Sequence, residues 1–89
     1  MGTTVANVLI SYDIDKLHTQ VKTALEILGY HDNFKNNNDP KIYKLPNTTM
    51  WHLTKSSDQA MSDLKSICNS NGVKLEKAIA VKATEFVGF

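Results

Sequence analysis

The strongest constraint in this sequence is an uncharged, apolar segment close to its start. Residues 5–12 (VANVLISY) are rich in β-branched and aromatic side chains. An apolar segment without polar alternation is typical of a strand buried on both faces, so it predicts the central strand of a sheet. Asp13 follows this strand directly, and Asp15 stands where it can cap a helix.

Two later segments have the apolar spacing of amphipathic helices. The first is expected to end at Gly29, since a glycine often follows the last helical turn. Its apolar stripe comprises Leu17, Val21, Ala24, Leu25 and Leu28. The second is expected to begin at Ser56 or Ser57 and to end at Asn71-Gly72, with Gln59 placed for a capping box. Its stripe comprises Ala60, Met61, Leu64, Ile67 and Cys68.

Residues 42–45 and 48–54 have the composition of strands and flank the turn signal Pro46-Asn47, which predicts a β-hairpin. Trp51 lies on a face of this hairpin that we expect to be part of the core. An alternative is that Trp51 and Tyr43 stack on bases, as aromatic side chains do on RNA-binding sheets.

The remaining segments complete the predicted fold. Residues 30–41 are polar and asparagine-rich and are expected to form a loop, whereas residues 75–83 alternate and predict the last strand. The order β-α-β-β-α-β predicts one α+β domain over residues 1–89. We expect it to be ferredoxin-like, with a four-stranded antiparallel sheet and both helices on one face. The apolar tail, residues 84–89, is a candidate for an additional edge strand.

Composition limits the classes of protein to which this chain can belong. The net charge of +1 does not suggest binding of nucleic acid through overall positive charge. The single cysteine, Cys68, cannot form an internal disulfide and favours a reducing compartment. No signal-peptide pattern is seen, and no apolar stretch approaches the ~18 residues of a membrane span. We therefore expect a cytoplasmic protein that does not enter a membrane. A chain of 89 residues supports a modest core, which favours dimerisation.

Asp13 is the residue most suited to chemistry. A carboxylate at the end of a central strand can bind a hard cation such as Mg²⁺ or Mn²⁺ through oxygen, and two such carboxylates across a dimer axis form a better site. The alternative is that Asp13 caps the first helix or makes a turn hydrogen bond. The three histidines, His18, His31 and His52, do not have the spacing of a metal site.

The segment VLISYDI, residues 8–14, resembles the first strand of the small CRISPR-associated endoribonucleases, the dimeric subunits of the spacer-integration complex. The predicted order of elements is also similar to that family and to the VapD-like toxin ribonucleases. A set of small relatives carries a Thr-Trp near the third strand, to which Thr49-Met50-Trp51 is similar.

The resemblance implies a homodimer that processes RNA or DNA. Asp13 would be the catalytic and metal-binding residue, with Mg²⁺ or Mn²⁺ between the two Asp13 side chains, and phosphodiester hydrolysis as the reaction. Ser11 and Tyr12 would flank the site as binding residues. Two other classes stay open because fold alone does not determine function. One is a non-catalytic interaction module, such as a toxin–antitoxin or phage–host factor, and the other is a ligand-sensing domain.

Overall fold

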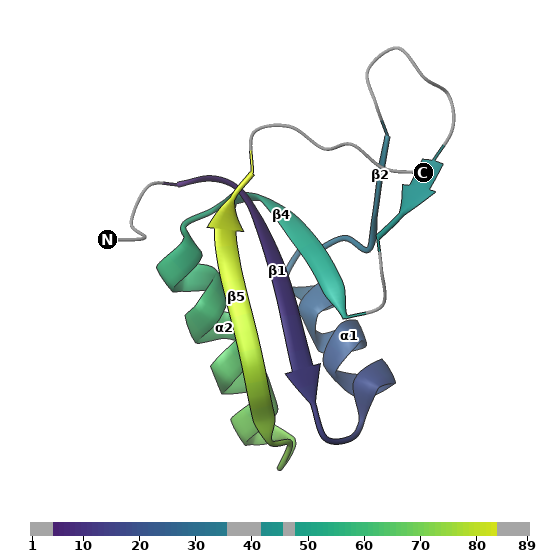
Figure 1. Cartoon of the computed structure of the whole chain (residues 1–89), viewed down its shortest axis with the longest axis vertical. Coiled ribbons are helices and arrows are strands. Elements are labelled where there is room, and N and C mark those ends of the chain that lie inside the picture. The colour runs from purple at the N-terminus through teal and green to yellow at the C-terminus, as the bar shows by residue number, and fades with distance from the viewer. Residues whose placement is uncertain (1–4, 36–41, 46–47, 84–89) are drawn as a thin grey trace.

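The computed structural model describes residues 5–35, 42–45 and 48–83. Its main sheet has three antiparallel strands in the order β4-β1-β5, so the apolar segment at the start forms the central strand, as predicted (Figure 1). Both helices lie on one side of this sheet. The elements in chain order are β1 (Ala6–Ile14), α1 (His18–Ile27), β2 (Asn33–Lys35), β3 (Ile42–Lys44), β4 (Thr49–Lys55), α2 (Ser57–Ser70) and β5 (Leu75–Lys82).

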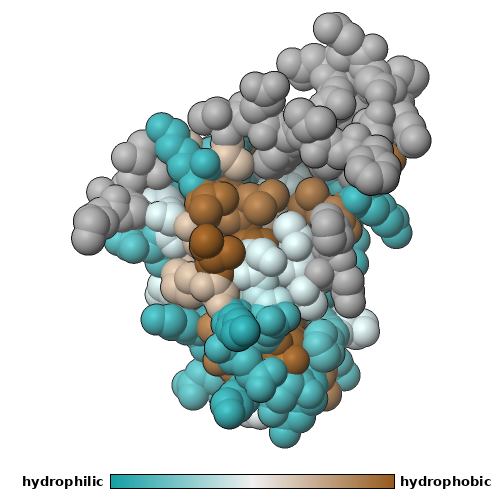
Figure 2. All heavy atoms as spheres, in the orientation of Figure 1, coloured by the Kyte–Doolittle hydropathy of each residue, from teal (hydrophilic) through white to brown (hydrophobic). Residues whose placement is uncertain are grey.

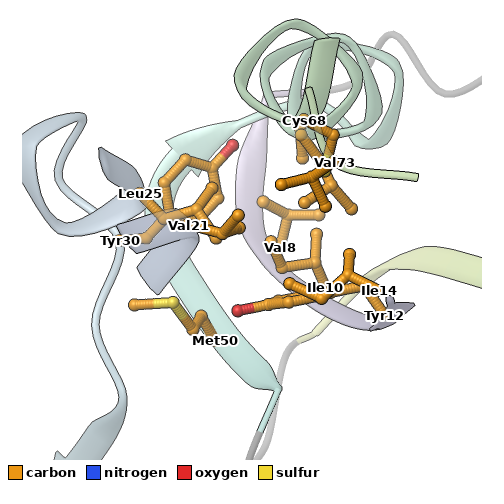
Figure 3. Packing of buried hydrophobic residues seen from close by; sticks show 12 residues of the cluster. Val8, Ile10, Tyr12, Ile14, Val21, Leu25, Tyr30, Met50, Cys68 and Val73 are labelled. Atoms are coloured by element: carbon orange, nitrogen blue, oxygen red, sulfur yellow. The ribbon is translucent and has the colours of Figure 1, made fainter. Parts of the chain in front are cut away.

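The core lies between the sheet and the two helices. Alternate residues of β1 point into it because successive strand residues face opposite sides of a sheet. These are Val8, Ile10, Tyr12 and Ile14, all of them buried. Val21 and Leu25 of α1 and Leu64 and Cys68 of α2 pack against them, and Figure 3 shows several of these contacts. The remaining residues of β1 therefore point to the face of the sheet that carries no helix.

The predicted four-stranded sheet is wrong, although the α+β class holds. Residues 42–44 form β3, but β3 pairs with β2 in a separate two-stranded sheet. The sequence predicts a loop at Asn33–Lys35 because its polar neighbours favour turns, and the cross-strand pairing overrides that local preference. The proposed edge strand over residues 84–89 lies outside the described residues.

The outer edge of β4 explains why β3 does not pair there. His31 forms an isolated bridge to Trp51, with N···O distances of 2.8 and 3.0 Å, and so occupies the middle of that edge. Leu45 N–H donates to the Asp32 carbonyl at 2.7 Å, which continues the pairing of β3 with β2. Thr48 has a φ of 62°, a left-handed conformation at the start of β4. Because β3 pairs with β2 and not with β4, the predicted β-hairpin of residues 42–45 and 48–54 is wrong.

The two helices begin differently. α2 has the predicted capping box: Ser56 Oγ accepts from Gln59 N–H at 3.1 Å, and Gln59 Oε1 accepts from Ser56 N–H at 2.9 Å. α1 follows Leu17, which has a φ of 58° and provides no side-chain cap. The predicted cap at Asp15 is wrong, because its Oδ1 accepts instead from Lys74 N–H at 2.9 Å, just before β5. That carboxylate satisfies a more distant backbone donor.

No helix among the described residues is long and apolar enough to cross a membrane.

Candidate functional site

The face of the sheet opposite the helices is the most prominent surface of the described structure. The β-ladders place Leu9 between Trp51 and Val81, and Ser11 between Thr49 and Ile79. We call this surface the open face. It comprises Leu9, Ser11, Asp13, Thr49, Trp51, Leu53, Lys77, Ile79 and Val81. Figure 2 views it directly and shows hydrophobic atoms gathered over its middle.

The middle of the open face is apolar and accessible to solvent. Leu53, Ile79 and Val81 are 53%, 58% and 40% exposed, although each is a large aliphatic side chain. An antiparallel sheet with one face in water normally carries polar residues on that face. This face therefore has the composition of a buried surface, and none of the helices and strands among residues 5–35, 42–45 and 48–83 covers it.

Trp51 belongs to the open face, so the expectation that it lies in the core is wrong. The strand alternation instead turns Met50 toward the helices, where it is buried. The Trp51 indole is half-buried, since its Nε1–H donates to the Asn33 carbonyl at 2.6 Å and its ring lies 5.2 Å from that of His31. His31, just before β2, and Asn33, the first residue of β2, thus hold the indole at the edge of the open face.

Asp13 lies at the end of β1 on the same open face and is exposed. Its neighbour across the ladder is Lys77 of β5. Within the part of the chain that the structure describes, the ion pairs are Lys22–Asp32 and Lys55–Asp63, and no side-chain hydrogen bond involves Asp13. The predicted alternative, in which Asp13 caps the first helix, is therefore not observed.

A shallow hollow of about 210 Å³ lies beside Asp13. It is lined by Ser11, Tyr12, Asp13, Lys77, Ala78 and Ile79. The structure thus brings together two of the three predicted site residues, Ser11 and Asp13, on the open face. Lys77 joins them, and the sequence analysis missed it because only the β1–β5 register places this lysine opposite Asp13.

Tyr12 borders the hollow, but its side chain points away from the open face. Its ring packs in the core, where the residue is 4% exposed (Figure 3). Burial, and then the nearby Cys68 thiol, raise the pKa of Tyr12 to about 12. Tyr12 therefore supports the strand that carries Asp13, and its phenol is not placed as an acid or base on the open face.

The described residues of one chain do not make a complete metal site. No group of three His, Cys, Asp or Glu side chains that could hold a metal ion occurs within residues 5–35, 42–45 and 48–83. His52 is fixed by structural hydrogen bonds: its Nδ1 accepts from Thr54 N–H at 3.0 Å, and its Nε2 contacts the Leu28 carbonyl at 3.1 Å. Among the described residues that line the hollow, Asp13 supplies one carboxylate, an oxygen ligand of the type that suits Mg²⁺ and Mn²⁺.

No protein-family model, curated protein or solved structure matches this chain. The resemblance of residues 8–14 to the CRISPR-associated endoribonucleases therefore stays a prediction.

Proposed function

We propose that the protein is a homodimer that packs two open faces together and hydrolyses phosphodiester bonds with a divalent metal ion bound by the two Asp13 carboxylates. One observation carries the proposal: the exposed Asp13 lies on the same face as the exposed apolar side chains of Ile79 and Val81. An interface that covers Ile79 lies beside Ser11, its partner in the ladder, and therefore next to the Asp13–Lys77 pair two residues further along the two strands.

A second copy of the chain is the partner that suits this face. Burial of exposed Leu53, Ile79 and Val81 contributes about 25 cal/mol for each Å² removed from water. Among the residues that define the open face, Asp13 and Lys77 carry the formal charges, so the face is neutral. Two neutral, apolar faces related by a two-fold axis meet without net repulsion, as an isologous interface requires.

Asp13 determines how the two faces can align. If the axis brings the two Asp13 side chains together, their like charges repel in a partly desolvated interface. A divalent cation held by the two carboxylates would offset this repulsion and would supply a bound water of lowered pKa and a counter-charge for the phosphate. The two carboxylates would hold the cation, and Ser11 would donate a hydrogen bond in the adjoining hollow.

The test compares Asp13→Asn with the wild-type protein on labelled single-stranded RNA and DNA in Mg²⁺ or Mn²⁺. We expect wild-type cleavage to need the metal and to fall at least ~100-fold in Asp13→Asn, because metal stabilisation of the transition state is worth several kcal/mol. Asp58→Asn, in the exposed first turn of α2, is the matched control and should cleave normally. Equal cleavage by Asp13→Asn would refute the mechanism.

A non-catalytic interaction module is the second candidate. The observation that favours it is the single carboxylate at the hollow, with no metal-binding group of three acidic, His or Cys residues in the described segments. This candidate predicts no hydrolysis of either nucleic acid with either metal, while Ile79→Lys still abolishes association through the open face. Metal-dependent cleavage by the wild-type protein would exclude it.

A further inference from the structure

The connection between α2 and β5 begins with Asn71-Gly72, the one Asn-Gly pair in the sequence. In such a pair the backbone nitrogen of the glycine can approach the asparagine side chain closely, because glycine has no Cβ to obstruct it. Both residues are exposed, and Gly72 has a φ of 64°. A Cβ built at Gly72 would meet no atom of the described residues within 4 Å. The surroundings therefore leave room for a ring formed between the two residues.

Asn71 ends α2, and its side chain closes the last turn of that helix. Its Nδ2–H donates to the Ile67 carbonyl at 2.8 Å, and its backbone N–H donates to the same carbonyl at 3.2 Å. The Gly72 N–H donates to the Asn69 carbonyl at 3.3 Å, beyond the usual range of ~2.7–3.2 Å. Attack by the Gly72 nitrogen on the side chain needs this last turn to open. An exposed helix end opens at low free energy, so the folded chain reaches the reactive arrangement.

We propose that Asn71-Gly72 is a self-modification site, at which Asn71 of the folded protein loses its side-chain amide nitrogen before any other asparagine does. A base in the solvent removes the proton of the Gly72 nitrogen, which then forms a bond to Asn71 Cγ. The Cγ–Nδ2 bond breaks, and Nδ2 leaves as ammonia with a proton returned by the solvent. Water opens the resulting five-membered ring. Cleavage of the bond to Cγ leaves aspartate, whereas cleavage of the bond to the backbone carbonyl carbon leaves isoaspartate.

Both products remove the side-chain cap of α2. A carboxylate in place of the amide cannot donate to the Ile67 carbonyl, and its negative charge stands at the negative end of the helix dipole. Isoaspartate also adds a carbon to the backbone just before Val73. Val73 is 7% exposed, and its N–H donates to the Cys68 carbonyl at 2.8 Å. A longer connection shifts Val73 relative to these contacts, so the modification weakens the joint between α2 and β5.

The experiment incubates the full chain in mildly alkaline buffer, once folded and once in guanidinium chloride, and follows each asparagine by peptide mapping with mass spectrometry. We expect Asn71 to be converted first. Its rate should rise with hydroxide concentration, because the attacking nitrogen must lose its proton. The reaction in guanidinium should be roughly tenfold faster than in the folded chain, since the one or two hydrogen bonds of the cap no longer have to open.

Three variants and one internal control sharpen the test. Asn71→Gln keeps an amide but would need a six-membered ring, so residue 71 should stay unmodified. Gly72→Ala obstructs the attack and should slow it severalfold. Asn71→Asp reproduces one product and should unfold at a lower denaturant concentration than the wild-type chain, because the donor to Ile67 is lost. Asn69 is also exposed but lies within α2 and precedes a serine, so it should keep its amide in the folded chain.

The outcomes need neither metal nor nucleic acid, so they are independent of the proposed function. Conversion that is fastest at Asn71 and slowed in Gly72→Ala supports the site. A faster reaction at another asparagine of the folded chain overturns it. So does an Asn71 that keeps its amide in both states, or in the folded chain through many half-times of the reaction in guanidinium. An unchanged rate in Gly72→Ala overturns the attack by the Gly72 nitrogen, and an unchanged unfolding midpoint in Asn71→Asp overturns the weakening of α2.

Discussion

At the scale of single residues, His52 joins the end of α1 to β4. Its Nδ1 accepts from Thr54 N–H, and its Nε2 contacts the Leu28 carbonyl, so both ring nitrogens are engaged. The ring of Tyr30 packs edge-on against it, with 4.9 Å between centroids. These contacts hold the imidazole tightly against Gly29, where the chain leaves the helix with a φ of 95°.

Gly29→Ala should therefore destabilise the protein more than Gly72→Ala. A Cβ at Gly29 would lie 2.9 Å from His52 Nε2, whereas at Gly72 it would meet no atom within 4 Å. Both glycines have positive φ, so each alanine costs about 1 kcal/mol in the backbone. The steric contact should add roughly another 1–2 kcal/mol at Gly29 only. Urea denaturation measures the difference, and equal free energies of unfolding would show that His52 moves away without cost.

Two buried tyrosines should make the fold sensitive to alkali. Burial, and then the hydrogen bond from Tyr30 to Asp63 (2.8 Å), raise the pKa of Tyr30 well above its usual value of 10.0. Burial raises the pKa of Tyr12 to about 12. The folded state thus keeps these protons at a pH where the unfolded chain loses them. The resulting stability is complete below pH 10 and is lost as the pH rises through the folded-state values.

Tyr30→Phe tests this linkage. It should cost about 1 kcal/mol at pH 7, since the Asp63 carboxylate loses a hydrogen bond. Above pH 10 the free energy of unfolding should fall less steeply in the variant than in the wild-type chain, because one titrating group is gone. Urea titrations at several pH values between 8 and 12 measure both slopes. Parallel curves would show that the phenol ionises equally in both states.

At the scale of elements, local patterns predicted what local interactions determine. The central strand, the two helices and the Ser56 capping box depend on composition, periodicity and neighbouring residues, and all were predicted, although β1 is buried on one face and not on both. The pairing of β3 with β2 was not predicted, because strand pairing depends on contacts between residues far apart in sequence. The same limit applied to the site: Asp13 could be chosen from its position after a strand, but Lys77 could not be placed beside it without the register.

The capping box should contribute measurably to α2. Ser56 is 3% exposed, and its hydroxyl satisfies Gln59 N–H, which has no partner within the helix. Ser56→Ala should lower the free energy of unfolding by about 1 kcal/mol. Ser57→Ala, one residue into the helix, is the control and should have little effect. Similar losses of stability in the two variants, measured by urea denaturation, would argue against a specific role for the cap.

At the scale of the whole molecule, the sheet has apolar side chains on both faces, and the two helices of the described residues both lie on one of them (Figure 1). The helix face carries the core, and the open face carries Leu53, Ile79 and Val81. The second face is the basis of the proposed homodimer, and Asp13 at its end is the basis of the proposed chemistry.

Association should depend on metal: Asp13→Asn removes the repulsion between two carboxylates and should dimerise in EDTA more tightly than the wild-type chain.

The central claim, that two open faces pack together in a homodimer, is tested most directly by sedimentation equilibrium in Mn²⁺. The proteins compared are the wild type, Ile79→Lys and Ile27→Lys. Both isoleucines are exposed, but Ile79 lies on the open face and Ile27 on α1, which covers the other side of the sheet. The account predicts a dimer for the wild-type protein and for Ile27→Lys, and a monomer for Ile79→Lys. A monomeric wild-type protein, or a dimer that survives Ile79→Lys unchanged, would contradict it.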